Sequence, residues 1–214
     1  MARRLLAEFI GTAFQLTGVI GSGIMAERLT DDVGLQLLAN AAATVGVLYM
    51  IIVSFGPVSG AHFNPAVTIA DAALGSRPWS DVGPYIVTQI AGGAVGVIAA
   101  NLMFDLDAIN VSDKVRDGGG QYLGEVIATF GLVLLVFSVV RSGRDHLAAG
   151  GVAAYIGGAY WFTSSTSFAN PAVSVTRTLS DTFAGIDPGS APMFVAMQLV
   201  GMGLAVVVAR VLYP

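Results

Sequence analysis

The sequence predicts an all-α membrane protein in which six transmembrane helices and two re-entrant half-helices form an inverted internal repeat. Hydrophobic residues make up 55% of the 214 residues, charged residues make up 11%, and the mean hydropathy is +0.75. These values lie outside the usual range of soluble domains. Six stretches of the chain lack Asp, Glu, Lys and Arg, and the tripeptide Asn-Pro-Ala occurs inside two of them.

The individual elements follow from these uncharged stretches. A helix needs about 20 residues to cross the hydrocarbon, so the four shorter stretches each predict one helix, within 9–26, 82–104, 126–140 and 188–209. The two longer stretches, 33–70 and 147–176, exceed one span. They contain Asn64-Pro65-Ala66 and Asn170-Pro171-Ala172. Because Asn is a favoured N-cap and Pro is favoured at the next position, each long stretch predicts a full span followed by a half-helix.

The two halves of the chain repeat each other. Ala7-Glu8-Phe9-Ile10-Gly11-Thr12 matches Gly124-Glu125-Val126-Ile127-Ala128-Thr129. The chain therefore divides into a single channel-like domain, 1–214, with halves of about 1–104 and 121–214 joined by an outer loop, 105–120. Each half holds an odd number of spans, so the second half is inverted, and inverted repeats place the substrate path at their interface. The glycine runs 92–96 and 150–151 predict close helix packing.

The loop charges predict that both termini are cytoplasmic. This orientation places more basic residues inside than outside, in agreement with the positive-inside rule: Arg3, Arg4, Arg77, Arg141, Arg144 and Arg210 inside, and Arg28, Lys114, Arg116 and Arg177 outside. The first helix is interpreted as retained rather than as a signal peptide, because Glu8 interrupts it and no clear cleavage site follows. A compact, tail-free chain of this kind is typical of prokaryotes. We therefore expect the protein in the plasma (inner) membrane of a bacterium.

Composition also excludes several classes of function. The net charge of −4 and the lack of a Lys/Arg cluster exclude a nucleic-acid surface. Zero cysteines exclude disulfides and thiolate metal sites, and no metal or cofactor is expected. No nucleophile or His pair is placed at membrane depth, so the chain is not expected to be an enzyme.

The paired half-helices predict one polar site. If they enter from opposite faces, their N-termini meet near the midplane, each with about half a positive elementary charge. The amide groups of Asn64 and Asn170 would add two donors that point into the lumen. Such a site accepts oxygen lone pairs and repels cations, including hydronium.

These segments resemble a known family. Ser59-Gly60-Ala61-His62-Phe63-Asn64-Pro65-Ala66-Val67-Thr68 and Asn170-Pro171-Ala172-Val173 are similar to the two signature loops of the aquaporin, or major intrinsic protein, family. The resemblance covers nearly the whole chain. It implies an aquaporin-like right-handed bundle, a homotetramer with one pore per subunit, and passive conduction of water or small neutral solutes across the lipid bilayer.

The family also implies an outer selectivity filter of four positions. By spacing from the two motifs, these positions fall at Thr44, Gly158, Ser167 and Val173. Members of the family usually carry Arg where this chain has Val173. The set contains no aromatic, charged or large side chain, so the expected filter is wide and neutral. Val173 together with Ser180-Asp181-Thr182-Phe183-Ala184-Gly185 resembles a bacterial subgroup associated with arsenic resistance.

Four further residues allow two interpretations each. Glu8 and Glu125 could relay protons, or could accept N–H groups from the loop before each Asn; their symmetric placement favours the second. His62 could be a pH gate or a pore-lining donor, and pore lining is favoured. Arg177 could be a displaced selectivity cation at the mouth, or could pair with Asp181 or cap loop carbonyls, which is favoured.

The predicted function is a passive aquaglyceroporin-type channel. It would conduct water and small uncharged solutes, such as glycerol, urea and neutral metalloid acids like arsenite, and exclude protons and ions. One alternative is a water-selective aquaporin. Another is an ion-coupled secondary transporter, for which Asp71 is the only candidate coupling residue.

Overall fold

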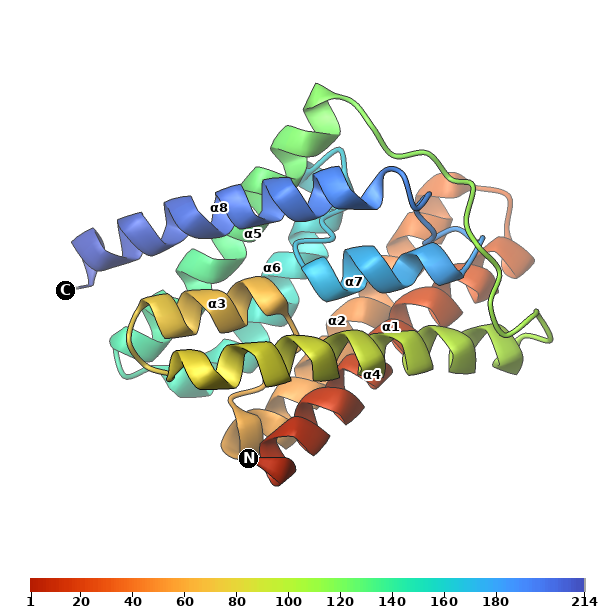
Figure 1. The fold of residues 1–214 in the computed structure, drawn as a ribbon. Coiled ribbons are helices and arrows are strands. Elements are labelled where there is room, and N and C mark those ends of the chain that lie inside the picture. The colour runs from red at the N-terminus through yellow and green to blue at the C-terminus, as the bar shows by residue number, and fades with distance from the viewer. Residues whose placement is uncertain (214) are drawn as a thin grey trace.

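The computed structural model describes residues 1–213, which form an all-helical bundle (Figure 1). Five helices have the length and composition to cross a membrane: α1 (Ala2–Leu29), α2 (Val33–Ser59), α4 (Val82–Met103), α5 (Gly119–Arg141) and α8 (Ala191–Leu212). The predicted sixth span is α6 (Ala148–Phe162), which has only 15 residues. At 1.5 Å per residue it is about 22 Å long, shorter than the hydrocarbon. Residues 1–213 also hold three short 3-10 helices: η1 (Trp79–Asp81), η2 (Asp145–Leu147) and η3 (Arg177–Leu179).

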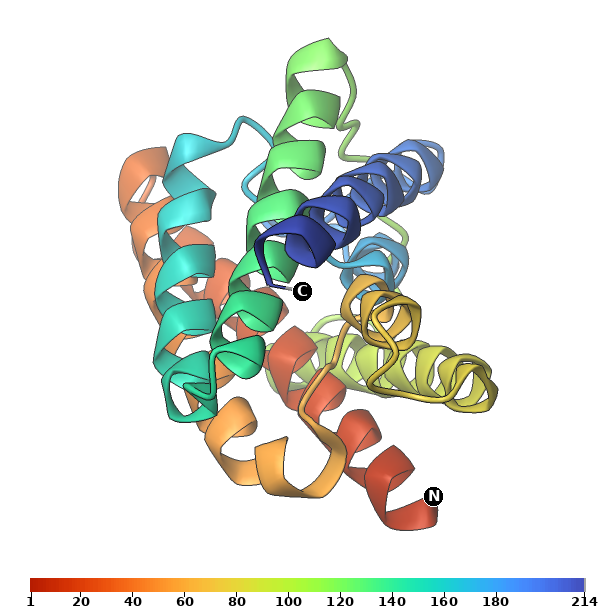
Figure 2. The same ribbon diagram turned by 90° about the vertical axis from the view of Figure 1, so that its left-hand side faces the viewer.

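Two short helices begin at the Asn-Pro-Ala tripeptides, as the sequence predicts. They are α3 (Pro65–Ala73) and α7 (Pro171–Thr176), the second of which continues into η3. Figure 1 shows them nearly in line in the middle of the bundle, with their N-terminal ends facing each other. In Figure 2 they lie between α4 and α8, while α2, α5 and α6 form the other side of the bundle. The interface between the halves is therefore built around these two helix starts.

The glycines in the run 92–96 allow the long helices to approach closely. A Cβ at Gly92 would lie 2.3 Å from a carbonyl oxygen of α1, and a Cβ at Gly96 would lie 2.2 Å from another. The second half repeats this contact, because a Cβ at Gly201 of α8 would lie 2.3 Å from a carbonyl oxygen of α5. The prediction for 92–96 is confirmed. The prediction for Gly150 and Gly151 is wrong, because a Cβ at either would meet open space or an ordinary contact.

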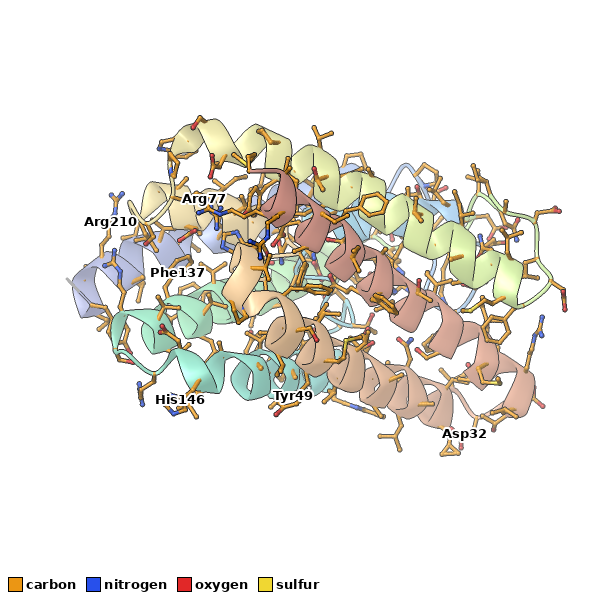
Figure 3. All side chains as sticks on the ribbon, turned by 90° about the horizontal axis from the view of Figure 1, so that it is seen from below. Asp32, Tyr49, Arg77, Phe137, His146 and Arg210 are labelled. Atoms are coloured by element: carbon orange, nitrogen blue, oxygen red, sulfur yellow. The ribbon has the colours of Figure 1, made fainter. Side chains whose placement is uncertain are left out.

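Charged residues gather at the two ends of the bundle. In Figure 3 Arg77, His146 and Arg210 lie at one end, near the C-terminus, and Asp32 lies at the other. We call the first end the terminal face and the second the loop face. At the terminal face the Arg210 guanidinium donates to the carbonyl of Ala73 at 2.6 Å, which places a cation at the negative C-terminal end of α3.

The loop that joins the halves crosses the loop face and fixes the segment after α7. The backbone N–H of Asn110 donates to Leu179 O and that of Ser112 donates to Thr178 O, both at 3.0 Å. Residues 110 and 180 form a parallel β-bridge. A Cβ at Gly185 would lie 2.4 Å from the Ser112 hydroxyl, so this segment packs tightly beneath the loop. We call residues 105–118 the strap.

Candidate functional site

Each Asn of the twin tripeptides caps its own half-helix. Asn64 Oδ1 accepts the backbone N–H of Ala66 at 2.9 Å, and Asn170 Oδ1 accepts that of Ala172 at 3.0 Å. Pro at N1 supplies a pre-set φ and needs no hydrogen-bond acceptor. The two side chains are 5% and 3% exposed. The helix starts thus follow from local sequence alone.

The two Asn side chains also tie the half-helices to each other. Asn64 Nδ2 donates to the carbonyl of Ala169, and Asn170 Nδ2 donates to the carbonyl of Phe63, both at 2.8 Å. This corrects the expectation that both amide groups simply face the lumen, because each amide donates one N–H to a carbonyl of the opposite loop. An amide NH₂ has two donors, so one N–H on each Asn is left for a solute.

Glu8 holds the first irregular loop in place. Its carboxylate is fully buried and accepts the backbone N–H of His62 at 3.0 Å and that of Phe63 at 2.7 Å. It also accepts the Ser59 hydroxyl at 2.7 Å and the Gln89 amide at 2.8 Å. Both oxygens therefore face donors. Burial of a carboxylate is tolerated when it is hydrogen-bonded in this way.

Glu125 does the same in the second half. It is fully buried and accepts the backbone N–H groups of Phe168 and Ala169, each at 2.9 Å. The Gln198 amide donates to it at 2.5 Å and also to the Ser174 hydroxyl at 2.8 Å. This is the loop-supporting geometry favoured from the sequence rather than a proton relay.

The loops held by these carboxylates have strained backbones at matching positions. The residues three and one before each Asn have positive φ without being glycine: Ala61 (52°), Phe63 (48°), Ser167 (52°) and Ala169 (49°). Such conformations cost about 1–3 kcal/mol each and persist only when the surroundings impose them. The carboxylates impose them here, and the result is that the carbonyls of Phe63 and Ala169 face the opposite Asn.

A cavity of about 260 Å³ runs past both Asn residues. Toward the terminal face it is lined by His62, Asp71 and Arg77, and toward the loop face by Val173 and Arg177. Apart from Thr44 and Tyr160, the wall that comes from α2, α5 and α6 is apolar and includes Leu48, Ile52, Leu132, Val136, Phe137, Val152 and Ile156. One side of the path thus offers polar groups, while the other is mostly apolar.

Three of the four expected filter residues line this cavity, and one does not. Thr44, Ser167 and Val173 line it, and they are 2%, 3% and 3% exposed. Gly158 is exposed on the outside of α6, and a Cβ there would point toward Phe162. Tyr160 lines the cavity from α6, and its hydroxyl lies 3.1 Å from that of Thr44.

The placement of Gly158 is therefore a correction. Two residues correspond to about 200° around a helix, so Gly158 and Tyr160 lie on nearly opposite faces of α6. The face of α6 that lines the cavity consists of residues spaced four apart: Ala148, Val152, Ile156 and Tyr160. This i, i+4 series is readable in the sequence, but counting back from Asn170 crosses an irregular loop and does not fix the rotation of α6. The expectation that the filter positions include no aromatic side chain is therefore wrong, because Tyr160 lines the cavity from α6 and Gly158 does not.

Arg177 lies inside the protein rather than in solvent. It is 2% exposed, lines the cavity, and its Nε donates to the carbonyl of Ala184. Its guanidinium carbon lies 3.5 Å from the centre of the Phe168 ring. The expected pairing with Asp181 is wrong, because that carboxylate accepts Ser112 Oγ and the Asp113 N–H instead. The capping of a loop carbonyl is present, and so is the position beside the cavity. Nothing in the sequence pointed to Phe168.

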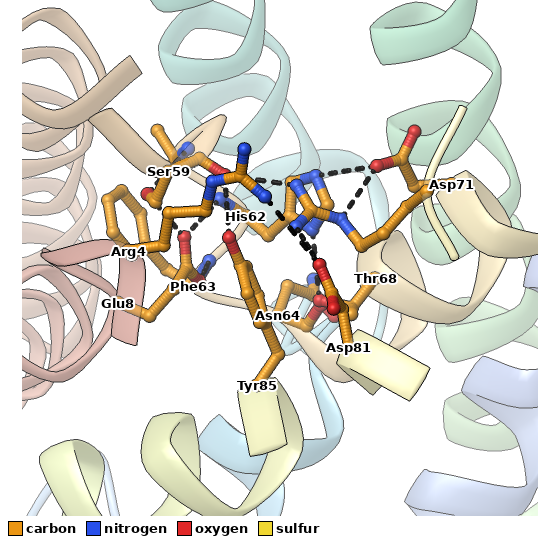
Figure 4. A network of polar contacts seen from close by, with 12 residues as sticks. Arg4, Glu8, Ser59, His62, Phe63, Asn64, Thr68, Asp71, Asp81 and Tyr85 are labelled. Carbon is orange, nitrogen blue, oxygen red and sulfur yellow. Dashed lines mark hydrogen bonds and ion pairs between the residues drawn. The ribbon is translucent and has the colours of Figure 1, made fainter. Parts of the chain in front are cut away.

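His62 lines the cavity near the terminal face and is fixed by two partners (Figure 4). Its Nδ1 lies 3.0 Å from the Thr68 hydroxyl and its Nε2 lies 3.3 Å from the Asp71 carboxylate. Asp71 in turn accepts Arg77 Nε at 3.0 Å, and the Arg77 guanidinium lies over the Tyr85 ring at 4.2 Å. Asp71 is thus engaged by the Arg77 guanidinium and the His62 ring, which argues against its use as a coupling-ion site.

The strap adds two cations beside the loop-face end of the cavity. Lys114 Nζ donates to the Phe183 carbonyl at 2.7 Å, and Arg116 Nε donates to the Gly185 carbonyl at 2.8 Å. Burial lowers the pKa of Lys114, and burial lowers the pKa of Arg116 to about 10. The Arg116 guanidinium lies 5.1 Å from the Phe168 ring. Phe168 therefore contacts two guanidinium groups, of which only that of Arg177 lines the cavity.

Comparison with known proteins agrees with this geometry. Residues 1–167 match the family described as Major intrinsic protein. The chain is 45% identical to a protein of Rhizobium meliloti named Aquaglyceroporin AqpS, over 98% of this chain and 90% of that protein. It is 30% identical to a Streptococcus pneumoniae protein named Glycerol uptake facilitator protein, over 65% of each chain.

A solved structure shares the fold. The X-ray structure of the aquaglyceroporin from Plasmodium falciparum matches with a TM-score of 0.70 over 99% of this chain and 95% of that one, at 20% identity. The family match ends before the second Asn-Pro-Ala, but the bacterial relative extends over both. With two capped half-helices meeting in one cavity of a six-helix bundle, the chain belongs to the major intrinsic protein family, whose members are membrane channels and not enzymes.

Proposed function

We propose that this protein is a passive channel of the aquaglyceroporin type, which conducts water and small uncharged solutes and excludes protons and ions. The observation that carries the proposal is the meeting of the two half-helix N-termini, with Asn64 and Asn170, in a single cavity. Positive helix ends and amide donors bind an oxygen lone pair and repel a cation. A relative of 45% identity is itself named an aquaglyceroporin.

The solutes we propose are glycerol, urea and neutral metalloid acids such as arsenite. Glycerol is supported by the two-sided cavity, because its hydroxyl groups match the polar side and its carbon backbone matches the apolar wall. At the level of the outer filter, small side chains at Ser167 and Val173 leave room, while Tyr160 limits it. The filter is therefore of intermediate width rather than fully open.

The test is flux into proteoliposomes that contain the purified protein. Stopped-flow light scattering follows water, glycerol and urea, and elemental analysis of washed vesicles follows arsenite. The expected result is non-saturating flux well above that of empty vesicles, with a low temperature dependence and no response to ion gradients. Saturable uptake that requires a sodium or proton gradient would contradict the proposal and indicate a transporter.

We also propose that the chain forms a homotetramer with both termini in the cytoplasm of a bacterial cell. Native mass spectrometry should then give the mass of four 21.9 kDa chains. The chain has no cysteine, so single cysteines introduced at Ser76 and Asp31 report orientation directly. A membrane-impermeant maleimide added to intact cells should label position 31 and not position 76; the reverse pattern would overturn the orientation.

A further inference from the structure

Arg177 lies on the same side of α7 and η3 as Val173. The two residues are four apart, about one helical turn, and both line the cavity. Val173 is at the third position of α7 and lies one turn closer to the Asn pair. The guanidinium thus reaches the same path as position 173, but nearer the loop face.

The charge on Arg177 has no carboxylate partner among residues 1–213. Asp181, four residues further along the chain, is engaged by the strap. Glu125 is engaged by the backbone N–H groups of the loop before Asn170. A guanidinium has five N–H donors, and within the described chain only its Nε finds an acceptor, the Ala184 carbonyl. A buried charge with unused donors is costly unless an oxygen ligand or water satisfies them. Arg177 lines the cavity, so a ligand or water there can reach the donors that remain.

An independent observation points to a ligand in the same cavity. The Ser167 hydroxyl is buried, lines the cavity and lacks a hydrogen-bond partner within residues 1–213. Across the cavity the hydroxyls of Thr44 and Tyr160 lie 3.1 Å apart, and both residues line it. A guanidinium, an unpartnered hydroxyl and a hydroxyl pair therefore line one cavity together with the apolar Val173, and Ser167 directly precedes the Phe168 ring that Arg177 covers.

We propose that Arg177 is the selectivity cation of this channel and that, with Ser167, Thr44 and Tyr160, it forms a binding site for uncharged solutes that carry several hydroxyl groups. The inference rests on the proposed channel function and adds the residue that determines which solutes pass. The guanidinium donates to solute oxygens and repels cations. The Ser167 hydroxyl can donate to or accept from the same solute, and the Thr44 and Tyr160 hydroxyls accept from it, because Thr44 already donates to the Asn40 carbonyl and Tyr160 to Thr44. Val173 gives the solute's carbon atoms an apolar surface.

The first test replaces the charge. Arg177→Gln and its matched control Arg28→Gln are reconstituted, and water flux, glycerol flux and the decay of an imposed pH gradient are measured. Arg28 also lies over an aromatic ring, at 5.0 Å, and also donates to a backbone carbonyl, but it is on the exposed surface. Arg177→Gln should speed proton leak at least about fivefold, which corresponds to about 1 kcal/mol, the repulsion of two unit charges about 4 Å apart in water. Arg28→Gln should leave it unchanged.

The second test moves the charge and stays informative if Arg177→Gln inserts poorly. Val173→Arg in the wild-type background places two guanidinium groups one turn apart in the path, so water and glycerol flux should both fall at least about tenfold, as expected for about 1.4 kcal/mol. Val173→Arg combined with Arg177→Gln restores a single cation and should recover water flux and proton exclusion.

The outcomes separate the two proposals. Wild-type vesicles that conduct no faster than empty ones overturn the channel function itself. Wild-type flux that is normal, with no change in proton leak for Arg177→Gln and no rescue in the double variant, overturns only the role of Arg177. Raised leak together with rescue supports it.

Discussion

Replacing Glu125 by Gln should collapse the second half-helix loop and stop conduction. The carboxylate accepts three N–H groups, from Phe168, Ala169 and Gln198. A Gln side chain has one acceptor oxygen and an NH₂ group that would face a donor. At least one buried backbone N–H is then left without a partner, which costs about 1–3 kcal/mol, and the bonds that remain are no longer charge-assisted.

The native conformation of the loop cannot tolerate the loss of this much free energy. Ser167 and Ala169 hold positive φ, at about 1–3 kcal/mol each, only while the carboxylate fixes the neighbouring N–H groups. A loss of about 3 kcal/mol lowers the population of the native loop roughly a hundredfold relative to its relaxed forms. The carbonyl of Ala169 would then leave the Asn64 amide, and the path would close or fill.

The assay is water and glycerol flux per inserted channel, together with the thermal unfolding midpoint in detergent. We expect Glu125→Gln to reduce both fluxes at least about tenfold and to lower the Tm. Glu27→Gln is the matched control, because Glu27 accepts a single bond from the Phe183 N–H at 2.9 Å at the surface; its flux should stay within about twofold of wild type. Glu125→Gln with normal flux and an unchanged Tm would refute the reasoning.

Two further predictions concern helix packing and the corrected filter. Gly92→Ala and Gly201→Ala each place a methyl group 2.3 Å from a neighbouring carbonyl oxygen, so both should lower the Tm, whereas Gly203→Ala, where a Cβ meets nothing within 4 Å, should not; equal Tm values for all three would show that the long helices adjust freely. Tyr160→Ala should raise the ratio of glycerol to water flux by widening the cavity. Gly158→Leu should leave this ratio unchanged, because position 158 faces outward. A loss of glycerol flux in Gly158→Leu would show that Gly158 belongs to the filter after all.

The features that local rules determine were predictable from the sequence. Asn followed by Pro starts a helix by capping geometry alone, so the starts of α3 and α7 follow from Asn64 and Asn170. The buried carboxylates were predictable for a related reason. A carboxylate at the start of an apolar helix has to find several donors, and the irregular loops offer unpaired backbone N–H groups.

The features that depend on helix rotation and on contacts between distant segments were not predictable. Gly158 and Tyr160 are two residues apart, and which of them faces the path depends on how α6 packs against α2 and α5. The surroundings of Arg177 come from Phe168 and from the strap, which engages Asp181 and so removes the ion pair that the i, i+4 spacing suggested. No periodic pattern in the sequence predicts these contacts.

Helix electrostatics explain why a cation is better placed at position 177 than at position 173. Position 173 lies in the first turn of α7, near its positive N-terminal end, whereas Arg177 is the C-cap, where α7 passes into η3, and lies toward the negative end. A cation is disfavoured at the first and favoured at the second by about 0.3–1 kcal/mol, and by up to about 2 kcal/mol where solvent is partly excluded. Moving the charge by one turn therefore lowers its electrostatic cost at both ends of the helix. It also leaves the Asn pair free of a competing donor. If Arg177 has the proposed role, cations are repelled at two successive levels of the path, first at Arg177 and then at the two helix starts.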